Sequence, residues 1–292
     1  MDLHTYHLHT QTALHCGTGQ SAGIVDLPIA RDKATNLPLV PGSSIRGVLR
    51  DDIRAKKQDI EEALFGPRSI SNNSQSFAGA LSIGDANLLI LPVRSLHGIV
   101  AYTTCPFILR RYAKDAHIPK SIPQPESLQA LTDKDNINRI TAEGKDLIIL
   151  EDLDIPTTNN EHVEEWATAI AHSLYANDSD LEKEFIKRFV VLSDDVFNYL
   201  STTATEIRTR IRINEATGVV DKGALWSEEN LPANSVLWGV YSVDTPKNKH
   251  NITAESLQKT FASSYLLQMG GNSGIGRGLV HLLTDDERGT TA

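Results

Sequence analysis

One acidic side chain, Asp26, stands in a glycine- and proline-bounded loop where a carboxylate could act on a bound ligand. It lies in the segment Gly23–Pro28, and the turn Pro41–Ser44 then opens a predicted helix. Free backbone N–H groups at a helix start, with hydroxyl and arginine side chains nearby, favour anions such as phosphate. A carboxylate beside such a helix start indicates chemistry on a nucleic-acid backbone. The alternative is that Asp26 makes only a local turn hydrogen bond.

The predicted helix after this turn carries a basic stripe. Ser43 or Ser44 suits the N-cap position, and apolar residues continue at helical spacing until Gly66–Pro67 ends the helix. The stripe on another face consists of Arg46, Arg50, Arg54 and Lys57. A stripe of this kind is usually a solvated face, but its origin beside the Pro41–Ser44 turn favours an anion site.

A second glycine-rich segment, Gly270–Gly278, holds five glycines in nine residues. It follows a predicted helix and precedes a strand, which excludes a dinucleotide-binding fingerprint, and the chain has no GK[ST] phosphate loop. A helix C-cap would explain one or two of these glycines. Five of them favour close approach of the backbone to a phosphodiester chain over a plain turn. The scarcity of aromatic residues favours recognition of the nucleic-acid backbone over stacking on bases.

Several other polar residues admit more than one interpretation. His15 could transfer protons, or it could lie at the surface at a strand end. Glu228 and Glu229 could be simple hairpin charges. His7 and His9 face the same way on one predicted strand, but no third ligand follows at a suitable spacing. We therefore expect a solvated strand face there rather than a metal site.

Composition limits the classes of protein to which the chain can belong. The 292 residues carry a net charge of −9, which argues against binding nucleic acid by bulk positive charge. The charges are segregated, as a local groove requires, with acidic residues gathered between 143 and 184. Cys16 and Cys105 form no CxxC pair, so neither a disulfide framework nor a zinc site is expected. Without a signal peptide or an apolar run of membrane-spanning length, we expect a cytoplasmic protein that does not enter membranes.

The order of predicted elements favours a single α+β domain. We expect strands over 3–14, 79–91, 98–103, 236–243 and 279–283, and helices over 43–64 and 253–269. A helical insertion covers about 113–204, with one strand at 147–150, and a hairpin with a basic edge covers about 205–235. Without these insertions, the remaining core (about 1–112 and 236–284) follows the ferredoxin-like pattern that the RNA recognition motif shares.

Taken together, these segments resemble the RAMP superfamily of CRISPR proteins. The resemblance rests on Pro41–Arg50 and on the glycine loop Gly270–Gly278 before the last strand. More narrowly, Val25–Arg31 and Gly223–Pro232 resemble the backbone subunit of type III-B (Cmr) effector complexes. The resemblance implies a ferredoxin-like palm, an inserted lid region and a thumb hairpin.

The resemblance also implies a function in antiviral defence. Such subunits bind guide crRNA as a multi-copy helical filament with other Cmr subunits, and they cleave complementary target RNA at regular intervals. The thumb displaces a nucleotide, and Asp26 would cut beside it as an endoribonuclease, with His15 and Glu228 assisting. A divalent cation such as Mg²⁺ would bind Asp26, and RNA phosphates would complete its coordination. The expected guide contacts are Ser43, Ser44, Arg46, Arg50, Arg210, Arg212, Gly270, Gly271, Gly274, Gly276 and Arg277.

Three alternatives stay open on the sequence. The chain could be a non-catalytic guide-binding filament subunit, a single-copy endonuclease that processes CRISPR transcripts, or a type III-A backbone homologue. The segment Asp26–Arg31 favours type III-B.

Overall fold

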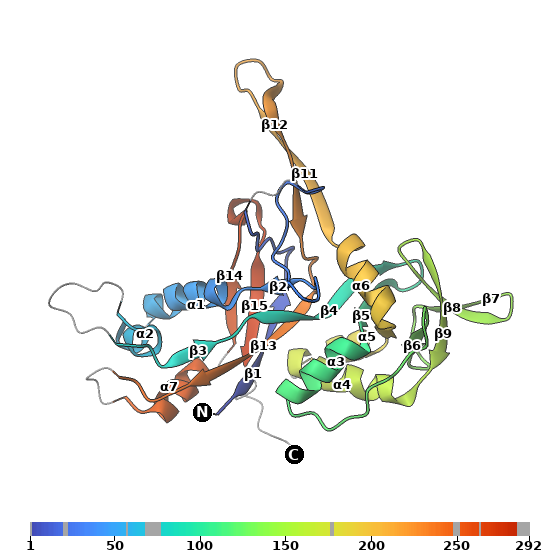
Figure 1. Ribbon diagram of the computed structural model, residues 1–292, viewed down its shortest axis with the longest axis horizontal. Helices are drawn as coiled ribbons and strands as arrows, with labels where there is room; N and C mark the ends of the chain where they lie inside the picture. The colour runs from blue at the N-terminus through green and yellow to red at the C-terminus, as the bar shows by residue number, and fades with distance from the viewer. Residues whose placement is uncertain are drawn as a thin grey trace.

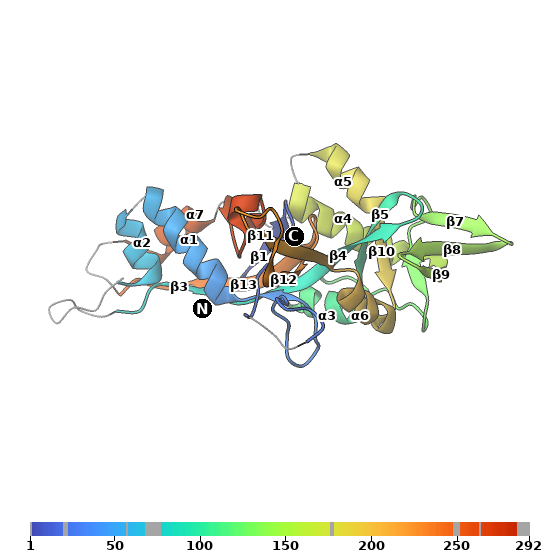
Figure 2. The same ribbon diagram turned by 90° about the horizontal axis from the view of Figure 1, so that it is seen from above.

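The computed structural model is a mixed α+β protein organised around one long sheet, with a separate two-stranded hairpin. It describes residues 2–19, 23–56, 58–67, 77–175, 178–247, 252–262 and 264–284. Figure 1 shows the hairpin projecting from the body of the molecule. Seen from above, the hairpin lies over the middle, with α1, α2 and α7 towards one end and β7, β8 and β9 towards the other (Figure 2).

The elements have the following bounds. The strands are β1 (His4–Thr10), β2 (Leu39–Val40), β3 (Leu81–Ile83), β4 (Ala86–Ser95), β5 (Ile99–Thr104), β6 (Ala130–Thr132), β7 (Arg139–Ala142), β8 (Lys145–Leu150), β9 (Leu153–Asn159), β10 (Phe189–Leu192), β11 (Glu206–Ile213), β12 (Val220–Asn230), β13 (Val236–Val243), β14 (Tyr265–Gln268) and β15 (Leu279–Thr284). The helices are α1 (Gly42–Lys56), α2 (Gln58–Phe65), α3 (Pro106–Asp115), α4 (Glu161–Tyr175), α5 (Ser179–Ile186), α6 (Asp194–Thr203), α7 (Ala254–Phe261) and the short 3-10 helix η1 (Ser273–Ile275).

The strand β1 lies at the centre of one half of the sheet. It pairs antiparallel with β13 on one side and β15 on the other, and β13 pairs in turn with β3 and β4. On one face, Tyr6 of β1 reaches Gly84 beside β3, where its hydroxyl donates to the carbonyl oxygen at 2.7 Å. On the other face, the helices α3 and α4 pack against β4, β13 and β1. Both faces of β1 are therefore covered.

This burial corrects the expectation of a solvated face at His7 and His9. His7 Nε2 lies 2.8 Å from the hydroxyl of Tyr112 on α3. The His9 ring packs edge-on against Tyr175 on α4. The period-2 pattern alone could not reveal that α3 and α4, which lie far along the chain, cover the polar side of the strand. Within the described ranges, no group of three His, Cys, Asp or Glu side chains could hold a metal ion.

The buried His9 should make folding stability depend on pH. Burial, with His281 close by, lowers the pKa of His9 to about 4, whereas an unfolded chain takes up the proton near pH 6.5. The unfolded state therefore binds more protons between these values, and stability should fall by about 3 kcal/mol as the pH drops from about 6.5 to about 4. Denaturant unfolding at several pH values measures this slope.

A pair of variants isolates the contribution of His9. His9→Gln should flatten the slope, and His97→Gln, at an exposed histidine, should leave it unchanged. A slope that persists in His9→Gln would assign the effect to another group.

The insertion contains more strand than its sequence pattern predicted. Besides α4, α5 and α6, residues 113–204 contribute β6–β10, of which only the strand near 147–150 was expected. These strands extend the sheet beyond β5, starting with the parallel pair β5–β10. Short buried strands such as Phe189–Leu192 are continuous apolar runs, which periodicity cannot separate from helix segments.

The predicted helix 253–269 is wrong in its second half. The helix α7 begins after Thr253, whose side chain caps Ser256 N–H, and it ends at Phe261. Residues Tyr265–Gln268 instead form β14, which pairs with β15. Their alternating burial is that of an edge strand, and its apolar positions also fit a helical spacing, which misled the prediction.

No helix among the described residues is long and apolar enough to cross a membrane. Both cysteines are buried with free thiols, and burial raises the pKa of Cys16 to about 11.

Candidate functional site

The candidate site lies at the base of the β11–β12 hairpin, where three segments from distant parts of the chain meet β12. Leu14 exchanges backbone hydrogen bonds with Leu231, just after β12. Gly278 N–H, at the end of the glycine loop, donates to the carbonyl of Ala13 at 2.9 Å. The loop that follows β1 thus lies under the hairpin and against the glycine loop, as Figure 1 shows.

The Asp26 carboxylate is exposed and is oriented by one residue of β12. Its Oδ2 accepts hydrogen bonds from the backbone N–H and the hydroxyl of Ser227, both at 2.8 Å. Asp26 N–H donates in return to Ser227 Oγ at 3.1 Å. These bonds hold the pKa of Asp26 below its ordinary value, so the group is ionised at neutral pH. Its Oδ1 accepts no hydrogen bond from any other described residue and can contact a ligand.

The His15 imidazole is buried, and it is fixed in one tautomer. Its Nδ1 lies 2.6 Å from the carbonyl oxygen of Glu229. Because a carbonyl can only accept, Nδ1 carries the proton and Nε2 is the basic nitrogen. Gly271 N–H donates to the His15 carbonyl at 3.0 Å. His15 and Asp26 are thus held by two β12 residues, Glu229 and Ser227, but within the described chain no hydrogen bond joins them.

The Glu228 carboxylate is buried and surrounded by donors. It accepts from the Trp226 indole N–H and from Asn272 Nδ2, both at 2.9 Å, and it pairs with Arg210. Asn272 Oδ1 accepts from Arg210 Nη1 at 2.9 Å. Glu228, which belongs to the hairpin, thus lies where the hairpin contacts the glycine loop.

The Glu229 carboxylate fastens the loop that carries Asp26. Its Oε1 accepts from Arg31 Nη2 at 2.5 Å and from Thr205 Oγ1 at 3.0 Å. Its Oε2 accepts from the backbone N–H of Ile29 at 3.1 Å. The side chains that hold the loop onto β12 are therefore those of Glu229 and Ser227. Leu27 adds two backbone hydrogen bonds to the same strand, because its N–H donates to the Ser227 carbonyl and its carbonyl accepts from the Glu229 N–H, both at 3.0 Å.

The helix start before α1 differs from its predicted form. The helix begins at Gly42, so Ser43 and Ser44 lie exposed in its first turn. The prediction that one of them is the N-cap is therefore wrong. The N–H of Gly42 donates instead to Asp85 Oδ1 at 2.7 Å. Sequence reasoning missed this carboxylate because it lies 43 residues further along the chain.

The first two arginines of the predicted stripe, Arg46 and Arg50, contact other residues of the protein rather than facing solvent. Arg46 donates to the Phe65 carbonyl at 3.0 Å and stacks over the ring of the same residue. Burial lowers the pKa of Arg46. Arg50 pairs with the buried Glu61 and donates to the Gly66 carbonyl at 2.7 Å. Both side chains hold α2 against α1, and Lys57 lies outside the described side chains.

The arginines of the hairpin are likewise paired with carboxylates. Arg208 pairs with Glu206, which also pairs with Arg277 of the glycine loop, and Arg212 pairs with Asp221 at 3.0 Å. The edge that the sequence predicted to be basic is therefore largely neutralised by acids of the same hairpin. Any phosphate contact by Arg212, whose side chain is 72% exposed, must compete with Asp221.

The glycines of the glycine loop divide into two groups. Gly270 has a φ of 71°, and a Cβ there would collide with the carbonyl of His15. Gly278, with a φ of 76°, would collide with the carbonyl of Met269. Gly271 would meet only the His15 ring at van der Waals distance, and a Cβ at Gly274 or Gly276 would meet no atom within 4 Å. Close approach to the chain's own backbone therefore explains the outer glycines but not Gly274.

The glycine loop yields a prediction with a matched control. Gly270→Ala should destabilise the fold by about 2 kcal/mol or more, because alanine tolerates a positive φ poorly and its Cβ displaces His15. Gly274→Ala should leave the unfolding midpoint unchanged, since neither its φ nor its neighbours oppose a Cβ. Thermal or denaturant unfolding tests both. Weaker guide binding by a stably folded Gly274→Ala would locate RNA at this backbone, whereas equal stability losses in both variants would contradict the steric argument.

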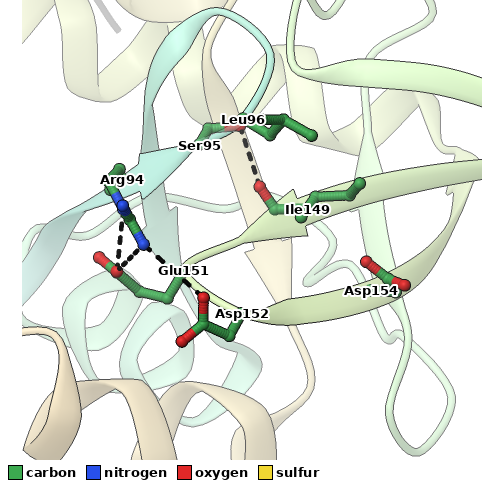
Figure 3. Close-up of a pocket in the computed structure, with 7 residues that line it drawn as sticks. All are labelled: Arg94, Ser95, Leu96, Ile149, Glu151, Asp152 and Asp154. Carbon is green, nitrogen blue, oxygen red and sulfur yellow. Dashed lines mark hydrogen bonds and ion pairs between the residues drawn. The ribbon is translucent and has the colours of Figure 1, made fainter.

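A separate hollow of about 610 Å³ lies away from this site, between the β4–β5 turn and β8–β9. Figure 3 shows Arg94 reaching two acidic residues there, Glu151 and Asp152, while Asp154 points elsewhere. None of the residues predicted to do chemistry lines this hollow. The candidate site therefore does not lie in this hollow but at the hairpin base, where the exposed Asp26 stands above the buried His15, Glu228 and Glu229.

Comparison with known proteins decides the family. Residues 7–281 match the model of the RAMP superfamily. The chain belongs to the RAMP superfamily. This RAMP chain is 35% identical over 281 residues to the CRISPR system Cmr endoribonuclease Cmr4 of Pyrococcus furiosus, covering 94% of this chain and 92% of that protein. It is 26% identical to the CRISPR system CMR subunit Cmr4 of Saccharolobus solfataricus, covering 93% and 92%.

Solved structures agree with the sequence comparison. The crystal structure of oligomeric Cmr4 from Pyrococcus furiosus superposes on the RAMP chain with a TM-score of 0.70 at 26% identity, covering 97% of this chain and 98% of that one. The resemblance predicted from sequence is thus confirmed, and the RAMP chain is a Cmr4 homologue.

Three residues that shape the site of this RAMP chain were not singled out individually from the sequence. Ser227 orients Asp26, Asn272 bridges to Glu228, and Arg31 pairs with Glu229. All three stand within segments that carried the family resemblance. Their partners are 44 to 201 residues away, so no local pattern could have revealed the pairings.

Proposed function

We propose that this chain is the backbone subunit of a type III-B CRISPR ribonucleoprotein. It binds guide crRNA in a multi-copy filament with other Cmr subunits in the cytoplasm, and it cleaves complementary target RNA at regular intervals. One observation carries the proposal: in a Cmr4 homologue, the ionised Asp26 is exposed and oriented by Ser227 at the base of a projecting hairpin. A relative that was crystallised in oligomeric form supports self-association.

We further propose a ferredoxin-like palm with a thumb. The chain order β1, α1, β4, β13, α7 and β15, and the neighbouring positions of β15, β1, β13 and β4 in the sheet, support the palm. The hairpin β11–β12 would be the thumb, and the region of about 113–204 the lid. The exposed hydroxyls of Ser43 and Ser44 and the open backbone at Gly274 support guide contacts at these two places.

The site residues suggest how cleavage would proceed. A target nucleotide displaced by the thumb can align its 2′-hydroxyl with the adjacent phosphorus, so that the 2′-oxygen forms a bond to phosphorus as the 5′-oxygen leaves. Asp26 Oδ1, the oxygen not used by Ser227, would orient the 2′-hydroxyl or accept its proton. His15 Nε2, the basic nitrogen, would exchange protons with the reacting oxygens.

A divalent cation is part of the proposal, although the protein offers it few ligands. The described residues contain no group of three metal-ligating side chains, so Asp26 Oδ1 would be the cation's main protein ligand, in place of its direct contact with the 2′-hydroxyl. Such a cation would need RNA phosphates and water to complete its coordination, and it would stabilise charge on the phosphoryl oxygens. We therefore expect no saturable Mg²⁺ binding in the absence of RNA.

Reconstitution tests the function as a whole. The complex with guide RNA, given an end-labelled complementary RNA, should yield products at regular spacing. Guide and target binding without any products would favour the non-catalytic filament subunit. Cleavage of repeat RNA by the isolated chain would favour the transcript-processing endonuclease.

A further inference from the structure

Three consecutive residues of β12 each hold a different part of the candidate site. Ser227 orients Asp26, and Glu229 fastens the loop at Ile29 and Arg31. Between them, Glu228 reaches the glycine loop. One strand therefore sets the spacing between the loop that carries the carboxylate and the loop proposed to hold the guide.

The contacts of Glu228 are those of a structural clamp. Its side chain is 6% exposed and accepts from Asn272 Nδ2 and the Trp226 indole, with Arg210 Nη1 at 3.3 and 3.4 Å from its two oxygens. Asn272 stands in the left-handed region, with a φ of 66°, and uses both ends of its amide, because its Oδ1 accepts from Arg210. The donors already satisfy the Glu228 carboxylate, so it is poorly placed to meet a substrate.

We propose that Glu228, Asn272 and Arg210 are positioning residues that fix the glycine loop in register with Asp26. The inference rests on the proposed function. It assigns Glu228 a different role from the assisting catalytic role that the family resemblance implied. Guide RNA held by the glycine loop would then present the target phosphate at a set distance from Asp26, through a single rigid strand. Small errors in that alignment are costly to the reaction rate.

A swap of the two side chains tests this role. Glu228→Gln alone places an amide donor against Asn272 Nδ2, and Asn272→Asp alone places two carboxylates together. Each single variant should lower the single-turnover rate, at saturating guide and target, by roughly 10- to 100-fold. In the double variant E228Q/N272D, the introduced amide donates to the introduced carboxylate and still accepts from Trp226, while that carboxylate accepts from Arg210. The double variant should recover to within about threefold of wild type.

Two measurements make the outcome decisive. A double variant that folds and binds guide normally but stays as slow as Glu228→Gln would show that the carboxylate at 228 reacts, which overturns the proposal. So would single variants that cut at the wild-type rate. Hydrogen exchange of Gly270–Gly278 in the isolated chain reports the clamp without any cleavage: exchange should rise in each single variant and return in the double. Failure of the wild-type complex to cut RNA would count against the proposed function and leave this exchange result intact.

Discussion

Asp26→Asn should abolish target cleavage while leaving guide RNA bound. Asparagine keeps an oxygen that can accept from the N–H and hydroxyl of Ser227, so the loop stays docked on β12. It loses the negative charge and the basic Oδ1 that would act on the 2′-hydroxyl. Loss of a positioned acid–base group typically lowers a rate by roughly 10²- to 10⁴-fold. Single-turnover cleavage of labelled target by the reconstituted complex measures the effect, and a gel-shift titration measures guide binding.

A matched variant and a partner variant sharpen this test. Asp32→Asn removes the same charge from the same loop at a carboxylate that only caps Ala34 and Thr35, and it should cut normally. Ser227→Ala keeps the carboxylate but removes one of its bonds, so a smaller loss is expected. Cleavage by Asp26→Asn at the wild-type rate would remove Asp26 from the chemistry, and loss of guide binding would make its role structural.

Ionisation of Asp26 should not limit cleavage near neutral pH. The Ser227 bonds lower the pKa of Asp26, so the active carboxylate persists below the ordinary aspartate pKa of about 3.9. Ser227→Ala should move any acid limb due to Asp26 upward, towards that ordinary value. A pH–rate profile of wild type and Ser227→Ala distinguishes two causes of lost activity. At pH 7 the carboxylate is ionised in both proteins, so a loss there comes from the orientation of Asp26 and not from its protonation.

The sequence was a good guide wherever the information is local. The strand predicted over Val236–Val243 is β13 at its observed bounds, and the turn residues after Ile213 predicted the hairpin. The carboxylate in the Gly23–Pro28 loop could be singled out because it precedes a helix start that suits an anion, although a local turn hydrogen bond explained it equally well. The family resemblance then supplied the role that spacing alone left open.

Sequence reasoning missed what depends on contacts between distant segments. Nothing local indicates that Glu61 meets Arg50, so a functional arginine stripe and a structural one look alike before folding. The same holds for Asp85, which caps α1 from 43 residues further along the chain. The acids that neutralise Arg208 and Arg212 are close in sequence, but the basic pattern of the hairpin drew attention away from them. For the charged residues predicted to bind RNA, the ion-pair partners could therefore be identified only from the structure.

Glu229→Ala should cost both stability and cleavage. The side chain of Glu229 is only 6% exposed and accepts from Arg31, Thr205 and the buried N–H of Ile29. Alanine removes this acceptor from Thr205 and Ile29 and leaves Arg31 only its bonds to the carbonyls of Asn36 and Ser201. Breaking a buried ion pair typically costs about 3 kcal/mol or more. At temperatures where the variant stays folded, the loop that carries Asp26 loses one of its two side-chain attachments to β12 and keeps the backbone bonds of Leu27, so cleavage should fall about 100-fold. Denaturant unfolding and single-turnover cleavage measure the two losses.

Two comparison variants separate burial from charge. Asp221→Ala breaks the ion pair with Arg212 on the same hairpin, where the arginine is 72% exposed, so the unfolding midpoint should scarcely change. Glu229→Gln keeps one acceptor oxygen but turns an amide donor towards either Ile29 or Arg31, so its stability should lie between wild type and Glu229→Ala. If Glu229→Ala proved as stable as Asp221→Ala, the loop would have to be held by Ser227 and the backbone bonds of Leu27. In that case, Ser227→Ala would have to produce the larger loss of cleavage, which reverses the order expected from the buried contacts.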